Sequence, residues 1–182
     1  MPEQDLWESF FDPSVILQQL DLNAHCCDVL DFGCGYGTFA TAAAQLISGN
    51  VVALDIDDSM LAMAQIQTFE KHVNNIIFQQ RDFINDGSGL DDESVDYAML
   101  FNILHVENPV SLLMEAYRNL RNGGKLGIIH WNVDADTPRG PPLSIRPSAK
   151  QCLKWAKEAG FKSDNVSIKN LPPYHFGLVV SK

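Results

Sequence analysis

The sequence has few basic residues and no long apolar run. Its 182 residues contain 13 Lys and Arg against 23 Asp and Glu, which gives a formal net charge of −10. Binding to nucleic acid depends on clustered Lys and Arg that neutralise phosphates, so we expect no nucleic-acid partner. No apolar stretch approaches the roughly 20 residues that a membrane-spanning helix needs, so we expect no membrane insertion.

Cysteine is also scarce. The four cysteines, Cys26, Cys27, Cys34 and Cys152, form no CxxC pair and no zinc-binding spacing. We therefore predict no metal site, and we expect free thiols of the kind found in reducing compartments. The first residues, MPEQDLWESF, are acidic and lack the apolar segment of a signal peptide. Together these features predict a cytoplasmic protein.

Apolar runs alternate with amphipathic segments along most of the chain. Strands are predicted over residues 28–32, 50–56, 75–79, 94–102, 125–131, 165–170 and 175–182. Helices are predicted over residues 5–20, with a restart at Asp12-Pro13, and over 36–47, 59–72, 109–120 and 148–159. This alternation is typical of a parallel sheet with helices on both faces. The last two strands are too close for a crossover helix and must pair antiparallel.

A glycine-rich loop, Gly33-Cys34-Gly35-Tyr36-Gly37, follows the first predicted strand. Ligands of such sheets bind where the strands end, and glycines let a ligand approach the backbone closely. The helix that follows offers free N–H groups at its start. Asp55 ends the second strand, where a carboxylate can accept hydrogen bonds from ribose hydroxyls. The sequence thus predicts a ligand that carries a ribose.

The sequence of this loop distinguishes between three classes of nucleotide ligand. A P-loop needs a Lys after its glycines, and none is present. A dinucleotide fingerprint, G-x-G-x-x-G/A, would place glycine or alanine at Thr38. The sequence is instead G-x-G-x-G, with Asp31 two residues before the first glycine. A carboxylate at that place suits a cationic amino group better than a pyrophosphate.

The segment VLDFGCGYG resembles motif I of the class I S-adenosylmethionine-dependent methyltransferases. Four further segments resemble the later motifs of that family, in the same order: ALDIDDSMLAMA (53–64), QQRDFIND (79–86), DYAMLFNILHVENP (96–109) and LRNGGKLGIIH (120–130). The resemblance implies an α/β, Rossmann-like, doubly wound sheet of seven strands in the order 3-2-1-4-5-7-6, mostly parallel with one antiparallel edge strand. The most similar subgroup acts on small molecules and resembles the ubiquinone- and menaquinone-pathway methyltransferases.

The resemblance also implies which residues would bind S-adenosylmethionine. The three loop glycines would approach the methionine and ribose, Asp31 the ammonium group and Asp55 the ribose. Ile56, Asp82 and Phe83 would contact the adenine, while two residues at the end of the fourth strand would border the methionine. The complete set is Asp31, Gly33, Gly35, Gly37, Asp55, Ile56, Asp82, Phe83, Phe101 and Asn102.

We expect one methyltransferase domain over residues 1–182. Within it, residues 1–24 would form a helical lid, residues 28–131 the cofactor-binding core, and residues 132–182 an acceptor-side loop, helix and terminal hairpin. The aromatic residues Trp7, Phe10 and Phe11 would either belong to the lid or pack as an ordinary helix face.

The acceptor side of the sequence leaves alternatives open. His105, just after the fourth strand, is the candidate catalytic base, or it shapes the loop through a backbone hydrogen bond. His130 and Trp131 would line the acceptor pocket or belong to the core. Arg139 and Arg146, on a proline-rich loop, would hold an anionic group of the acceptor or point into solvent.

The predicted function is S-adenosylmethionine-dependent methyl transfer to a small molecule. Such a transfer depends mainly on alignment of the reacting groups, which explains why no shared catalytic residue is required. Two alternatives remain. One is a Rossmann-type NAD-dependent oxidoreductase, and the other is a non-catalytic cofactor-binding module that keeps the methyltransferase fold.

Overall fold

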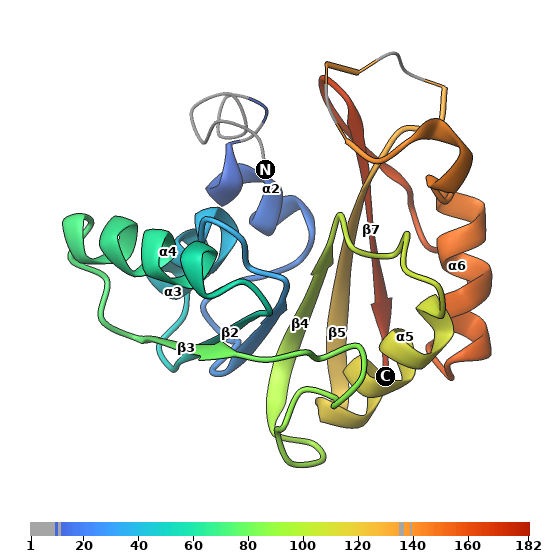
Figure 1. Ribbon diagram of the computed structural model, residues 1–182. Helices are drawn as coiled ribbons and strands as arrows, with labels where there is room; N and C mark the ends of the chain where they lie inside the picture. The colour runs from blue at the N-terminus through green and yellow to red at the C-terminus, as the bar shows by residue number, and fades with distance from the viewer. Residues whose placement is uncertain (1–9, 11, 135–136, 139) are drawn as a thin grey trace.

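A seven-stranded sheet forms the centre of the computed structural model, which describes residues 10, 12–134, 137–138 and 140–182 (Figure 1). The strands are β1 (Val29–Phe32), β2 (Val51–Asp55), β3 (Ile76–Gln80), β4 (Val95–Phe101), β5 (Leu120–Trp131), β6 (Lys169–Leu171) and β7 (His175–Ser181). The helices are α2 (Pro13–Gln19), α3 (Thr38–Leu46), α4 (Asp58–Glu70), α5 (Pro109–Asn119), the short 3-10 helix η1 (Leu143–Ile145) and α6 (Ala149–Glu158).

The order of the strands is β3-β2-β1-β4-β5-β7-β6, which is the order that the family resemblance implied. Strands β1 to β5 pair parallel to one another, and β7 pairs antiparallel with both β5 and β6. The antiparallel strand is therefore β7, with the short strand β6 outside it at the edge of the sheet. This arrangement confirms the predicted mostly parallel, doubly wound α/β fold.

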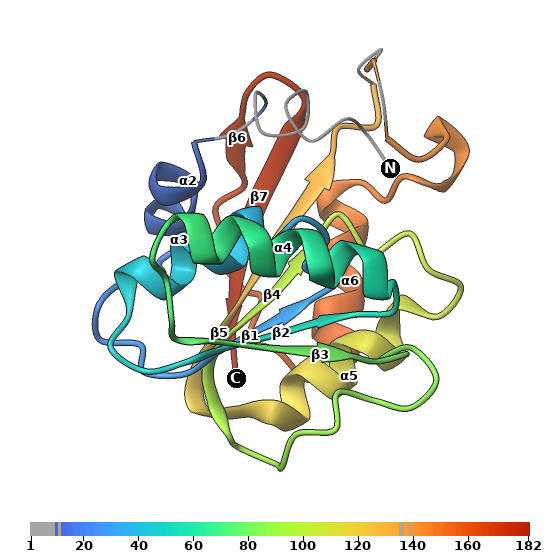
Figure 2. The ribbon, with the colours of Figure 1, turned by 60° about the vertical axis from the view of Figure 1, so that its left-hand side comes forward.

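Helices α2, α3 and α4 cover one face of the sheet, and α5 and α6 cover the other (Figures 1 and 2). Because side chains alternate along a strand, each face has its own apolar core. Leu30 and Phe32 of β1 belong to the cluster under α5 and α6, whereas Val29 belongs to the cluster under α2 and α3. The strand β1 is buried at all four positions, as expected for a central parallel strand.

The helix predicted over residues 5–20 is described from Pro13. Asp12 caps it by accepting a hydrogen bond from the N–H of Val15 at 3.2 Å, and Pro13 occupies the first turn. A helix thus starts at Pro13, where the restart was predicted, and the earlier part of the prediction falls largely on residues outside the described ones. None of the helices in the described residues has the length and apolar character needed to cross a membrane.

Two strand boundaries differ from the prediction. Strand β5 begins at Leu120, directly after α5, and a register shift between Val95 and Tyr97 on β4 accommodates the extra residues at Gly123 and Gly124. Gly123 and Gly124 form part of an irregular strand, because the chain resumes pairing with β4 at Lys125.

The strand predicted over residues 165–170 is also wrong over its first four residues. Only Lys169–Leu171 pairs with β7, and Asn165 has a left-handed φ of 60° in a turn. Alternation of apolar residues cannot distinguish a paired edge strand from an extended segment that lacks a partner.

Gly37 fixes how α3 packs on α4. It has a φ of +75°, and a Cβ added there would lie 2.8 Å from Cβ of Ala64. Gly37→Ala should destabilise the protein by about 2–5 kcal/mol, the sum of a left-handed backbone and an overpacked contact. Gly123→Ala is the matched control, because its φ is +80° and nothing lies within 4 Å of the added Cβ; it should cost only about 1–2 kcal/mol. Urea denaturation of both variants measures the difference, and equal losses would contradict the packing role.

Candidate functional site

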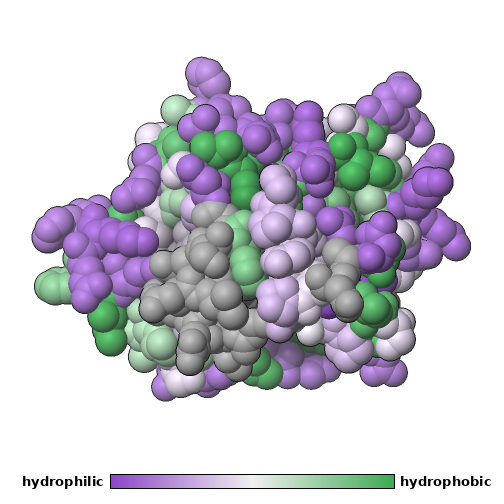
Figure 3. All heavy atoms as spheres, turned by 90° about the horizontal axis from the view of Figure 1, so that it is seen from above, coloured by the Kyte–Doolittle hydropathy of each residue, from purple (hydrophilic) through white to green (hydrophobic). Residues whose placement is uncertain are grey.

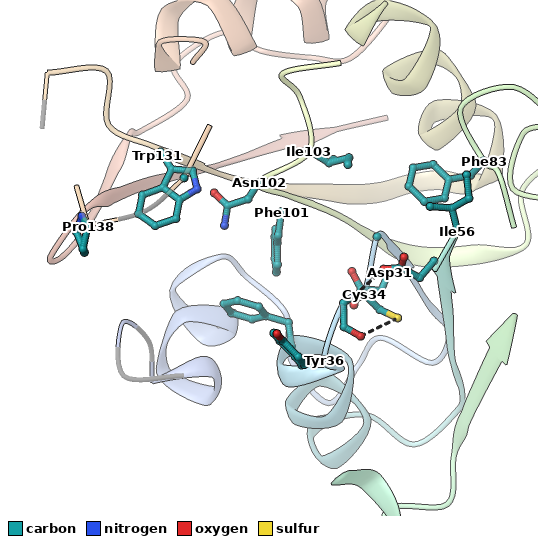
Figure 4. A pocket seen from close by; sticks show the side chains of 15 residues that line it. Asp31, Cys34, Tyr36, Ile56, Phe83, Phe101, Asn102, Ile103, Trp131 and Pro138 are labelled. Carbon is teal, nitrogen blue, oxygen red and sulfur yellow. Dashed lines mark hydrogen bonds between the residues drawn. The ribbon is translucent and has the colours of Figure 1, made fainter. Parts of the chain in front are cut away.

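A pocket of about 570 Å³ lies where the carboxyl ends of β1, β2, β4 and β5 meet (Figure 4). Figure 3 views this end of the molecule, where hydrophobic side chains form separate patches among hydrophilic ones. The volume is in the range of clefts that hold one drug-sized ligand. The described lining consists of Asp31, Gly33, Cys34, Gly35, Tyr36, Phe39, Asp55, Ile56, Phe83, Phe101, Asn102, Ile103, Trp131, Pro138 and Gly140.

The parallel register is what gathers these residues. Strand β1 lies between β2 and β4, so the loop after Phe32 is flanked by Asp55 on one side and by the end of β4 on the other. All of the ten residues predicted to bind the cofactor line the pocket except Gly37 and Asp82. The sequence therefore located the pocket and most of its wall.

The glycine loop and Asp55 are bonded to each other. One carboxylate oxygen of Asp55 accepts the N–H of Gly35 at 2.8 Å, and the other accepts the N–H of Asp57 at 3.0 Å. Gly33 and Gly35 have positive φ values of 78° and 52°, which turn the backbone out of β1 and toward Asp55. The carboxylate is thereby fixed in the pocket while each oxygen keeps capacity for another hydrogen bond.

Asp31 is a buried carboxyl at the base of the pocket. Its side chain is only 3% exposed, and no described residue donates a hydrogen bond to it. Burial, and then the nearby charge of Asp55, raise the pKa of Asp31 to about 7. An uncompensated carboxylate at this place favours a cationic ligand group over an anionic one.

Gly37 and Asp82 have other contacts. Gly37 caps α3 and packs against Ala64, as described above. The carboxylate of Asp82 accepts two hydrogen bonds from Asn85, one from its N–H at 3.1 Å and one from its side chain at 2.8 Å, and these lower its pKa. Asp82 thus holds the turn after β3, while the next residue, Phe83, faces the pocket.

His105 lies outside the pocket lining and beside His130. Nδ1 of His105 is 3.4 Å from Nε2 of His130, whose side chain is fully buried. Burial lowers the pKa of both rings, that of His130 to about 3. This contact joins two side chains, whereas the second predicted role of His105 was a hydrogen bond to the backbone that shapes the loop. Within the described residues, His, Cys, Asp and Glu side chains form no group of three that could bind a metal ion.

Trp131 is the centre of an aromatic group beside the pocket. Its ring lies 5.9 Å from Phe10, 6.3 Å from Tyr174 and 4.1 Å from His175, measured between centroids. The guanidinium of Arg146 lies over the same indole ring, 5.5 Å from its centroid. Phe10 therefore connects the N-terminal segment to the end of β5.

Several lining residues were not predicted. Cys34 and Tyr36 alternate with the loop glycines, so the motif already implied their position at the pocket. Phe39 lies in α3 after the loop, and Ile103 follows the end of β4. Burial, and then the charges of Asp31 and Asp55, raise the pKa of Cys34, so it is a neutral thiol. Trp7, Phe11 and Arg139 lie outside the described residues.

Removal of the Asp31 charge should stabilise the protein in a pH-dependent way. A carboxyl whose pKa is raised on folding contributes stability below its unfolded pKa, near 3.9, and loses it as the pH rises through about 7. The gain from Asp31→Asn should be small at pH 4 and reach about 2–4 kcal/mol at pH 8. Urea unfolding at several pH values measures it. Asp58→Asn, at an exposed carboxylate, is the control and should show no such trend with pH. A change in unfolding free energy for Asp31→Asn that is the same at every pH would contradict the cost of burying this charge.

Residues 24–170 match a family model described as a methyltransferase domain. Ribosomal protein L11 methyltransferase of Dechloromonas aromatica (strain RCB) is 33% identical over 123 residues, which are 65% of this chain and 38% of that protein. Demethylmenaquinone methyltransferase of Lactobacillus johnsonii is 31% identical over 123 residues, 64% of this chain and 47% of that protein. The chain thus spans less than half the length of these curated relatives.

A solved structure shares the fold. The crystal structure of a SAM-dependent methyltransferase from Aquifex aeolicus superposes with a TM-score of 0.82 and 23% identity, covering 94% of this chain and 90% of that one. S-adenosylmethionine is the methyl donor of the class that the sequence resembled, and the family match agrees with that resemblance. The chain belongs to the methyltransferase-domain family, and it has the fold of the S-adenosylmethionine-dependent enzyme from Aquifex aeolicus.

Proposed function

We propose that this protein transfers a methyl group from S-adenosylmethionine to a small molecule. The observation that carries the proposal is the pair of carboxylates at the pocket: Asp55 is bonded to the glycine loop, and Asp31 is buried without a hydrogen-bond partner among the described residues. The ammonium and ribose hydroxyl groups of this cofactor supply the positive charge and the donors that the two carboxylates lack.

Each remaining cofactor residue has a role that fits its position. The backbones of Gly33 and Gly35 would lie against the methionine and ribose, with Gly37 holding the helix behind them. Ile56 is 60% exposed and Phe83 lines the pocket, so both offer apolar surface to the adenine. Asp82 would accept a hydrogen bond from the adenine amino group, through carboxylate lone pairs that its two hydrogen bonds from Asn85 do not use. Phe101 and the backbone of Asn102 would border the methionine.

When bound, the cofactor supplies an electrophilic methyl group on sulfur. The protein's contribution would be to hold that group in line with the acceptor and exclude water from the pocket. His105 would act as a base only for an acceptor that must lose a proton, and its contact with His130 supports a positioning role.

The three segments of the domain would divide the work. Residues 28–131 would bind the cofactor, residues 132–182 would cover the acceptor, and residues 1–24 would form a lid. The T-shaped contact of Phe10 with Tyr174, 5.4 Å between ring centroids, supports a lid that reaches the end of the β6–β7 hairpin.

The alternatives have weaker support. The buried carboxyl of Asp31 beside the glycine loop suits the pyrophosphate of a dinucleotide poorly, and Thr38 occupies the place of the third fingerprint residue. A small acceptor is supported by the pocket volume of about 570 Å³, which cofactor and acceptor must share. The four cysteines are free, in keeping with the cytoplasmic location that the sequence predicts.

A turnover screen tests the function. The protein is incubated with S-adenosylmethionine and a broad panel of metabolites, and release of S-adenosylhomocysteine is measured. Product formation with at least one small acceptor is expected. Tight cofactor binding with no turnover across the panel would favour a non-catalytic module, and binding of NAD instead would favour an oxidoreductase.

Asp55→Ala should weaken the binding of S-adenosylhomocysteine by roughly ten- to a hundredfold, because hydrogen bonds to a charged group contribute about 1.5–3 kcal/mol. Isothermal titration calorimetry measures it. Asp57→Ala is the matched control: Asp57 caps α4 by accepting the N–H of Ser59 at 2.9 Å, so its loss should lower stability but change affinity less than about threefold. Unchanged affinity in Asp55→Ala would refute the ribose assignment.

A further inference from the structure

Strand β3 forms one edge of the sheet and pairs with β2 on one side. Hydrogen bonds at its two ends show which way its backbone points. The carbonyl of Asn75 accepts the N–H of Val51 at 3.0 Å, and the N–H of Arg81 donates to the carbonyl of Asp55 at 2.8 Å. The direction of the backbone groups alternates along a strand, so the odd-numbered residues of β3 face β2 and the even-numbered residues face outward.

The outward row consists of the N–H and C=O groups of Ile76, Phe78 and Gln80. No hydrogen bond from the described part of the chain reaches these groups. Natural edge strands are usually protected from pairing by a charged residue, a proline or a bulge. The sequence of β3, IIFQQ, has neither a charged residue nor a proline, and its pairing with β2 is regular. Strand β3 is therefore an edge that is open to further pairing.

Helix α4 lies along β3 at this edge of the sheet (Figures 1 and 2). Its outer surface is apolar, because Met63, Ile66 and Phe69 are all exposed, Ile66 by 61% and Phe69 by 82%. No charged residue occurs in α4 between Asp58 and Glu70. We call Met63, Ile66 and Phe69 the α4 stripe. An exposed apolar stripe on a helix is typical of an interaction surface.

The combination of an open edge and the α4 stripe favours one kind of partner. An extended peptide would pair with β3 but leave the α4 stripe exposed, and a lipid surface would cover the stripe but offer the backbone no hydrogen bonds. A second copy of this chain supplies both an edge and a stripe. The net charge of −10 makes two copies repel each other, and the α4 stripe and β3 form an uncharged face on which they can meet.

We propose that two copies of the protein associate through β3 and α4, with the two β3 strands antiparallel about a two-fold axis at Phe78. Phe78 then pairs with Phe78 of the second copy, and Ile76 pairs with Gln80. Each of these pairs exchanges two hydrogen bonds, about six in all. A two-fold axis perpendicular to the sheet places both α4 helices on the same face, so that the two stripes face each other.

The expected dimer is weak. A strand of five residues spans only roughly 17 Å, and the contact is therefore smaller than a standard protein–protein interface. We expect a dissociation constant of about 10–100 µM. Because the two copies carry the same charge, added salt should screen their repulsion and tighten the dimer.

Sedimentation equilibrium between about 5 and 500 µM spans this range on both sides. The apparent mass should rise from 20.2 kDa toward twice that value as the concentration increases. Phe69→Glu places two like charges at the contact and should weaken the dimer at least about tenfold. Met114→Glu is the matched control, because Met114 is 56% exposed on α5, which covers the opposite face of the sheet; it adds the same charge and should change the constant less than about threefold.

Amide hydrogen exchange at high concentration tests the strand pairing separately. The N–H groups of Ile76, Phe78 and Gln80 should exchange about two- to tenfold more slowly in the wild type than in Phe69→Glu, a factor set by the two dimer fractions. The N–H groups of Ile77 and Gln79 face β2 in both proteins and are the internal reference.

Three results would overturn the inference: a wild-type protein that stays monomeric over the whole concentration range, an equal loss of the dimer in Phe69→Glu and Met114→Glu, or outward amides that exchange equally in wild type and Phe69→Glu. A monomer would leave a peptide or a lipid surface as the partner of this face. Neither β3 nor the α4 stripe is part of the described pocket lining, so none of these results bears on the proposed methyl transfer.

Discussion

The hydrogen bond between the N–H of Gly35 and the carboxylate of Asp55 is the contact on which the site depends. It joins the loop after β1 to the end of β2 and so fixes the floor of the pocket before any ligand arrives. The bond is possible only because β1 and β2 pair in parallel register and because the glycines adopt left-handed φ values. Sheet topology, loop conformation and carboxylate position are therefore one coupled feature.

Asp31 shows what this arrangement costs. The same register that brings Asp55 to the loop places a second carboxyl beside it, and burial raises the pKa of Asp31 to about 7. Without a ligand, the folded protein must either keep Asp31 protonated or bury its charge. It is therefore less stable than it would be with an uncharged residue at this position. A cationic ligand group would remove this free-energy cost by pairing with the carboxylate, and that gain would contribute to the affinity for the ligand.

Local patterns in the sequence predicted where the strands and the glycine loop lie, and the family resemblance implied the strand order and the residues assigned to the cofactor. Apolar periodicity located the strands, and glycines next to a strand end located the loop. Side-chain partners could not be predicted in the same way. Asp82 bonds to Asn85, Arg146 bonds to its own loop, and His105 meets His130. Each outcome depends on which donor or acceptor is nearest in the folded chain, and spacing in the sequence does not encode that.

The two ends of the pocket differ in the same way, because one depends on the sheet and the other on contacts of a loop. The end of the pocket that is proposed to hold the cofactor is built from strand ends and a glycine loop, whose positions the whole sheet determines. The opposite end of the pocket includes Pro138, on a loop whose Arg146 donates to the carbonyl of Asn132 and lies over the ring of Trp131. Because Pro138 and Arg146 lie on a loop that follows β5, substitutions in that loop can alter this end of the pocket without moving Asp31 or Asp55. A fold of this kind can keep one cofactor while its acceptor changes.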